Sequence, residues 1–104
     1  MVKISVLYPH ENSSAFNMHY YLNNHIPMLR QKFGAACKGV AVEQGLGGGA
    51  PGSRPTYAAM AHLLFDSVES FRAAFVPHAQ TIMADTPNYS TVQPVVQISE
   101  VKLS

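Results

Sequence analysis

Residues 20–28 of the chain read Tyr-Tyr-Leu-Asn-Asn-His-Ile-Pro-Met and lie in its first segment with helical periodicity. Pro27 has no N–H for the carbonyl of Asn23, and its ring crowds that carbonyl, so we expect the helix to kink or restart near residues 24–26. His25 lies at a position that helical spacing turns toward the core. The apolar residues that recur at this spacing predict one buried stripe, formed by Met18, Leu22, Leu29 and Phe33.

Two interpretations of His25 are open at this point. An imidazole on the core face, beside a backbone break and two tyrosines, is a candidate site residue. Protein cores also bury hydrogen-bonded histidines as packing groups, and proline kinks are often structural. The local pattern alone does not choose between these two interpretations.

Length and composition describe one domain over residues 1–104. The single cysteine, Cys37, excludes an internal disulfide framework and a cysteine-based metal cluster. Seven basic and six acidic side chains give a net charge of +1 without a basic block, so we expect no nucleic-acid surface. No apolar run approaches the roughly 20 residues that span a bilayer, and no signal segment opens the chain. We therefore expect no membrane association and a cytoplasmic location.

The pattern of apolar residues predicts four strands, at residues 2–8, 37–46, 56–65 and 92–103. A bent helix is expected over 15–33, a second helix from residue 66 to the proline at 77, and a short one over 78–85. We expect Ser13 or Ser14 to cap the first helix, and Asp66 with Glu69 to cap the second. The glycine-rich residues 45–55 are expected to form a loop that leads into a strand, which disfavours a phosphate cradle.

This order of elements predicts an α+β fold of the ferredoxin-like, split βαβ type (β-α-β-β-α-β). It contains a four-stranded antiparallel sheet with its helices on one face. The third strand carries apolar residues on both faces, so the opposite face of the sheet needs a cover as well. Charged residues make up only 12% of the chain, which also favours a surface covered by another subunit. We expect a homodimer in which two copies pack through this sheet face.

Three segments resemble the EthD family, which is named after ethyl tert-butyl ether degradation. They are Tyr20-Tyr21 followed by His25-Ile26-Pro27-Met28, residues 62–71 (His-Leu-Leu-Phe-Asp-Ser-Val-Glu-Ser-Phe), and residues 97–101 (Gln-Ile-Ser-Glu-Val). The resemblance extends over essentially the whole chain. It implies a dimeric α/β barrel, in which two ferredoxin-like protomers face each other through their sheets.

The resemblance also implies a class of activity. Family members are associated with oxidoreductase activity, and the EthD protein itself accompanies a haem-thiolate monooxygenase system. The wider superfamily includes cofactor-free monooxygenases, muconolactone-type isomerases, polyketide cyclases and haem-degrading enzymes, with the reactive pocket between sheet and helices. Fold analogy therefore narrows the class of chemistry without fixing the reaction.

In such a fold, His25 would face the pocket and act as a general base near neutral pH. Tyr21, four residues earlier, is expected to donate a hydrogen bond to the enolate or phenolate that forms. Asn24 lies beside the break and is expected to offer an amide to the substrate.

Four further residues are candidates for substrate binding. His62 faces either His25 or the dimer interface, depending on the side of the sheet to which the third strand turns it. His78, Asn88 and Tyr89 are candidates for the mouth of the pocket, although a capping or surface role is favoured for His78.

We expect no metal site and no cofactor. The sequence contains no His-Glu-x-x-His motif or comparable ligand pair. Convergence of His25, His62 and His78 in space is the one arrangement that would suit a metal. Haem binding through an axial histidine has only the analogy with the superfamily behind it.

Two classes of function remain open. The first is a cofactor-free, monooxygenase-like oxidoreductase of small-molecule catabolism that acts on a small apolar or aromatic compound, or an isomerase or cyclase of the same fold. The second is a non-catalytic accessory protein that holds such a compound for a partner monooxygenase. An unfilled pocket beside His25 and Tyr21 would favour an enzyme. An imidazole fully bonded to protein groups would favour a binding protein, and a filled interior would leave only a dimeric scaffold.

Overall fold

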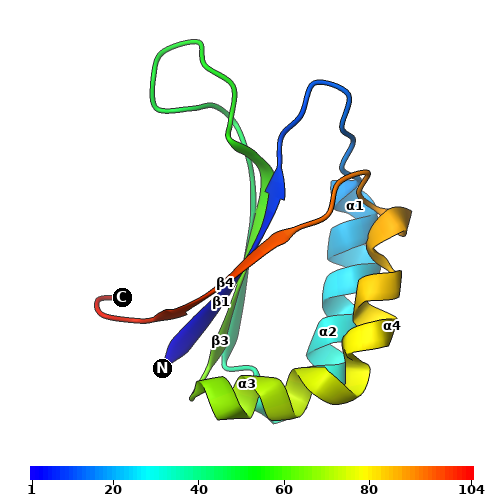
Figure 1. Ribbon diagram of the computed structural model, residues 1–104, viewed down its shortest axis with the longest axis vertical. Helices are drawn as coiled ribbons and strands as arrows, with labels where there is room; N and C mark the ends of the chain where they lie inside the picture. The colour runs from blue at the N-terminus through cyan, green and yellow to red at the C-terminus, as the bar shows by residue number, and fades with distance from the viewer.

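The computed structural model describes all residues from Met1 to Ser104. Four strands, β1 (Val2–Pro9), β2 (Gly39–Gln44), β3 (Tyr57–Phe65) and β4 (Val95–Glu100), form one antiparallel sheet in the order β2-β3-β1-β4. The helices α1 (Met18–Tyr20), α2 (Ile26–Phe33), α3 (Val68–Phe75) and α4 (Ala79–Ala84) all lie on one side of this sheet (Figure 1). The predicted α+β, ferredoxin-like order of elements is thereby confirmed. None of these helices is long and apolar enough to span a membrane.

The sheet register decides which side chains face the helices. Ile4 of β1 lies between Leu63 of β3 and Ile98 of β4, so these three side chains point to the same side of the sheet. The buried side chains of β3 alternate on this helix-facing side and are Ala59, Ala61, Leu63 and Phe65. The residues between them, Ala58, Met60, His62 and Leu64, point to the opposite side, which no helix covers (Figure 1).

Each of the two main helical segments is capped by a residue that the sequence did not single out. Asn17, rather than Ser13 or Ser14, caps the first segment, and Ser67, rather than Asp66, caps α3. Both cap side chains accept the backbone N–H three residues ahead, each at 3.0 Å. The predictions were wrong because an N-cap must have its oxygen within reach of that N–H, and the residues preceding these caps stay outside the helices.

The predicted break in the first helical segment is confirmed and takes the form of a π-helical turn, Tyr21–His25, directly before α2. The predicted buried stripe was wrong at one position, since Leu22 is 47% exposed. The wider turn shifts the inward face, so that Tyr21 is buried in place of Leu22. Gly34, with a φ of 57°, ends α2 as a glycine in the left-handed region commonly does.

β2 and β4 are shorter than the apolar pattern predicted, whereas β1 extends one residue further, to Pro9. β4 begins at Val95, because Pro94 lacks an N–H for the ladder and lies just before the strand. The glycine-rich residues 45–55 connect β2 to β3 as a loop, as expected. Residues 86–88 form a single 3₁₀ turn between α4 and β4.

The cap of α3 gives a test of the local structure. Ser67→Ala removes the oxygen that accepts the Ser70 N–H, so the free energy of unfolding should fall by about 1 kcal/mol. Asp66→Ala should change it by less than about 0.5 kcal/mol, since Asp66 is exposed and makes only a 3.9 Å ion pair with Lys38. Urea denaturation measures both values, and a larger loss in Asp66→Ala would show that Asp66 is the cap.

Candidate functional site

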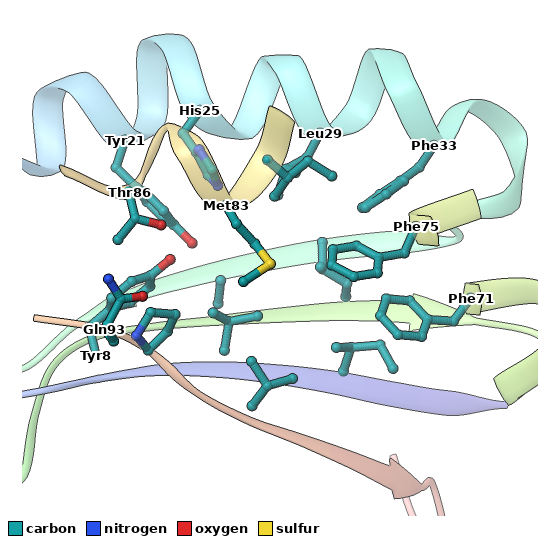
Figure 2. A pocket seen from close by; sticks show the side chains of 17 residues that line it. Tyr8, Tyr21, His25, Leu29, Phe33, Phe71, Phe75, Met83, Thr86 and Gln93 are labelled. Atoms are coloured by element: carbon teal, nitrogen blue, oxygen red, sulfur yellow. The ribbon is translucent and has the colours of Figure 1, made fainter. Parts of the chain in front are cut away.

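A cavity of about 340 Å³ lies between the helix-facing side of the sheet and the helical layer. The small side chain of Ala61 on β3 lines it and leaves room that a larger residue would fill. Figure 2 shows polar side chains at one end of the cavity and three aromatic rings at the other. Tyr8, Tyr21, Thr86 and Gln93 belong to the polar end, and Phe33, Phe71 and Phe75 form the aromatic end.

The cavity opens between α4 and the start of β4. Three of its lining residues, Met83, Gln93 and Val96, are exposed to solvent, and the others are buried or half-buried. Met83 is 62% exposed and Val96 is 54% exposed. Figure 2 shows the Met83 thioether reaching from α4 over the cavity. The mouth is thus bordered by apolar side chains and one amide.

The π-helical turn positions His25. The N–H of Ile26 bonds to the carbonyl of Tyr21, five residues earlier. Because Pro27 cannot take part in the regular ladder, the extra residue in the turn relieves the crowding that its ring would cause. The turn places the imidazole of His25 and the ring of Tyr21 in a stack, with centroids 5.2 Å apart and an interplanar angle of 14°. Both side chains point into the cavity (Figure 2).

His25 is 3% exposed and bonds to a carboxylate from a second helical segment, which is distant in the chain. Its Nδ1 lies 2.8 Å from Oδ2 of Asp85, at the end of α4. A carboxylate only accepts hydrogen bonds, so we assign the proton of the neutral ring to Nδ1, which donates to Asp85. The second nitrogen, Nε2, then carries a lone pair. Its protein contact is the Tyr89 hydroxyl at 3.4 Å, which is long for a hydrogen bond.

Two other side chains hold Asp85 in place. The Tyr20 hydroxyl donates to Oδ1 at 2.7 Å, and the Asn88 amide donates to the same oxygen at 2.8 Å. With the bond from His25, both carboxylate oxygens have donors, while no lysine or arginine pairs with Asp85. The aspartate is therefore an ion that neutral donors stabilise.

These contacts move the pKa values of the pair. Burial lowers the pKa of His25 below 6.5, and the bond to Asp85 offsets this effect only in part. Burial alone would raise the pKa of Asp85, but the hydrogen bonds from Asn88, His25 and Tyr20 outweigh it and lower the value below 3.8. At neutral pH the pair is therefore a neutral imidazole bonded to a carboxylate.

Three buried tyrosines surround the polar end of the cavity. The hydroxyls of Tyr8 and Tyr89 lie 2.7 Å apart, and the rings of Tyr8, Tyr21 and Tyr89 contact one another with centroids 4.8–5.7 Å apart. Burial raises the pKa of each of these phenols. They stay protonated at physiological pH. The hydroxyls of Tyr8 and Tyr21 line the cavity and can donate hydrogen bonds to an oxygen in it, Tyr8 when Tyr89 is the donor of their mutual bond.

The structure brings together part of the predicted set of site residues. His25 and Tyr21 line the cavity, and Tyr89 contacts His25 while 3% exposed. Asn24 and Asn88 are exposed and lie instead along a shallow groove on the outer surface, beside Tyr20. Asn88 reaches the site only through its bond to Asp85.

Of the two positions that the sequence left open for His62, the structure has the one away from His25. His62 lies on the uncovered side of the sheet, where its Nδ1 is 2.9 Å from the Ser5 hydroxyl and its Nε2 is 3.4 Å from Glu43. The register of β3 turns alternate residues to opposite sides, and Ala61 and Leu63 take the helix-facing one. His78 precedes α4 without capping it through its side chain and does not line the cavity. No three His, Cys, Asp or Glu side chains lie close enough together to hold a metal ion.

Sequence reasoning missed four residues of the site, namely Tyr8, Asp85, Thr86 and Gln93. Tyr8 has a signal in the sequence, because it shares the strand face of Ile4 and Val6. Asp85 and Thr86 lie in a segment that its composition marked only as a turn. Their contact with the first helix depends on how the two helical segments pack, so no local pattern reveals it.

The fold and the enclosed cavity between sheet and helices define a ferredoxin-like protein of the dimeric α/β barrel class. The family model described as the EthD domain matches residues 10–92. The chain therefore belongs to the EthD family.

Solved structures agree with this assignment. An EthD-like protein from Ralstonia eutropha JMP134 is 40% identical, with a TM-score of 0.94 over 99% of this chain and 93% of that one. An EthD family protein from Bacillus halodurans C-125 is 21% identical, with a TM-score of 0.72 over 97% of this chain and 98% of that one. SnoaB, a cofactor-independent oxygenase from Streptomyces nogalater, shares the fold at 12% identity, with a TM-score of 0.55 over 99% of this chain and 93% of that one. The comparison with curated proteins gives no match.

The pKa of His25 tests whether its imidazole is bonded to Asp85 as the structure shows. NMR titration of the imidazole should give a midpoint below 6.5 in the wild type and a lower one in Asp85→Asn, which loses the charge that favours imidazolium. The unfolded chain then binds a proton near pH 6.5 that the folded chain binds only at lower pH. The free energy of unfolding should therefore decrease as the pH falls below 6.5. Asp66→Asn is the control, and an equal midpoint in all three proteins would show that Asp85 does not act on His25.

Proposed function

We propose that this protein is an enzyme of small-molecule catabolism, a cofactor-free oxidoreductase that begins its reaction by proton abstraction with His25. The observation that carries the proposal is the asymmetry of the imidazole. Nδ1 is bonded to Asp85 at 2.8 Å, whereas the contact of Nε2 to a protein group is the long one to Tyr89. A fixed ring with an available lone pair beside a cavity is what a general base needs.

The tyrosines complete this chemistry. When His25 removes an acidic carbon-bound or phenolic proton, negative charge develops on the substrate. The hydroxyls of Tyr8 and Tyr21, which line the cavity and stay protonated, can donate to that charge. Asp85 stabilises the imidazolium that forms and keeps its ring in place, so it acts as a positioning residue.

The oxidoreductase reaction requires dioxygen as the oxidant. His25 takes one proton from a methylene group, and the carbanion transfers electrons to dioxygen. Loss of the second hydrogen then leaves a carbonyl group at that carbon. One oxygen atom enters the carbonyl and the other leaves as water, so atoms and electrons balance. SnoaB, a cofactor-independent oxygenase, shares the fold, which supports this class of reaction by analogy.

A second candidate function is a carrier that holds an apolar ligand for a partner monooxygenase. The apolar mouth favours it, because the exposed Met83 and Val96 would suit the transfer of a ligand to another protein. A carrier would bind ligand without turnover, and loss of the His25 imidazole would leave its affinity nearly unchanged.

His25→Ala decides between the two functions. Compounds from a thermal-shift screen of phenols, aromatic acids, cyclic ketones and haem are first assayed for turnover in air. For an enzyme, His25→Ala should lower turnover about 10²–10⁴-fold while the protein remains folded. Asn24→Ala, one residue away but outside the cavity, should keep wild-type rates. Equal rates in wild type and His25→Ala would contradict the role of the base.

We also propose that two copies pair through the uncovered side of the sheet. This side carries the half-buried Leu7, Met60 and Leu64, and alternate residues of β3 on it are largely apolar. A pair of sheets packed face to face would bury these side chains and give the barrel of this fold class.

Met60→Glu tests the dimer. The new carboxylate would lie beside Glu43, which is opposite Met60 in the sheet, and would have to be buried between the copies. Size-exclusion chromatography with light scattering should show a dimer for the wild type and a monomer for Met60→Glu. Val76→Glu, an equally large change on the exposed surface of the helical layer, should remain dimeric. A monomeric wild type would contradict the pairing.

A further inference from the structure

We propose that the cavity selects uncharged ligands with one hydrogen-bonding head group and a ring-containing body, and that Asp85 strengthens this preference. The inference rests on the same cavity as the proposed function and adds the charge of its ligand. It starts from the lining, which contains no Lys, Arg, Asp or Glu. A carboxylate or phosphate on the ligand would therefore enter without a cation to meet it, and burial of an unpaired charge is costly.

The negative charge of Asp85 further disfavours an anion in the cavity. Its carboxylate bonds directly to His25, a lining residue, and the other donors to it are the neutral Tyr20 and Asn88. The ion pairs of the chain that contain a lysine, Lys38–Asp66 and Lys102–Glu100, involve other carboxylates. One uncompensated negative charge thus lies behind the imidazole. The Asp85 side chain borders the outer groove but is only 15% exposed, so salt screens its repulsion of a bound anion less than that of a fully exposed carboxylate.

The two ends of the cavity fix the orientation of the ligand. Hydroxyls and an amide gather at one end (Figure 2). An uncharged carbonyl, amide or hydroxyl group of a ligand can accept hydrogen bonds there, and an amide N–H or a hydroxyl can also donate one. The rings of Phe33, Phe71 and Phe75 gather at the other end, where apolar and aromatic surface is removed from water. The volume of about 340 Å³ lies at the lower end of the range for small-molecule pockets, roughly 300–1,000 Å³. A body of one or two rings fits this size.

Two probes of equal shape and different charge test the preference. 2-Naphthamide is neutral and 2-naphthoate is an anion at pH 7.5, while both carry the same ring system. The chain contains no tryptophan, so naphthalene fluorescence can report binding with little background from the protein. We expect the wild type to bind the amide at least about tenfold more tightly than the carboxylate.

Two variants test whether Asp85 contributes to the preference for the neutral probe. Asp85→Asn keeps the size and a hydrogen-bond acceptor for His25 but removes the charge, so the ratio of the two affinities should shrink by at least about threefold. The amide should still bind more tightly, because the lining offers no cation to a carboxylate. Asp66→Asn removes the same charge from an exposed side chain that does not line the cavity, so it should keep the wild-type ratio. Equal or tighter binding of the carboxylate by the wild type would overturn the proposal. An unchanged ratio in Asp85→Asn would overturn the role of that residue, and failure of both probes to bind would show that the cavity does not accept such a ligand.

Failure of this inference is distinguishable from failure of the proposed function. The probes measure binding at equilibrium and need no turnover. If His25→Ala retains catalysis or no substrate is found, the affinity ratio of the probes still stands. If the carboxylate binds better, His25 can still act as a base toward an anionic substrate.

Discussion

The hydrogen bond between His25 and Asp85 joins two parts of the helical layer that lie 60 residues apart in the chain. It links the π-helical turn to the end of α4, and Tyr20 reaches the same carboxylate from α1. The helical segments are thereby fixed to each other. A layer held in this way can cover a cavity without collapsing into it, whereas an unsupported void costs stability in proportion to its size. The interaction that orients the imidazole thus also keeps the space in front of it open.

The sequence predicts most of the framework because the relevant signals are local. Alternation of apolar residues identifies the strands, and Pro27 marks the break in the first helix. Their order then leaves few topologies to consider. The inward position of His25 follows from the same spacing. What the pattern misses is the form of the break, since a π turn adds a residue and exchanges Leu22 for Tyr21 on the buried face.

Other parts of the site were beyond local reasoning. Asp85 contacts His25 only after two helical segments have packed, and the segment that contains it reads as an ordinary polar turn. The side of the sheet that His62 occupies depends on a register between strands distant in sequence, and one step of register would reverse it. Long-range packing and strand register determine where both residues lie: Asp85 lies next to His25 of the cavity, and His62 lies on the opposite side of the sheet.

The mouth of the cavity is separate from the place where the helices are held together. It lies between α4 and β4, bordered by Met83 and Val96, while the contact of His25 with Asp85 lies within the helical layer. Rotation of the exposed Met83 thioether, a motion on the picosecond to nanosecond scale, therefore changes the mouth without opening the helical layer. The bond to Asp85 holds the imidazole in one orientation, so the ring need not reorganise when a molecule arrives at the mouth.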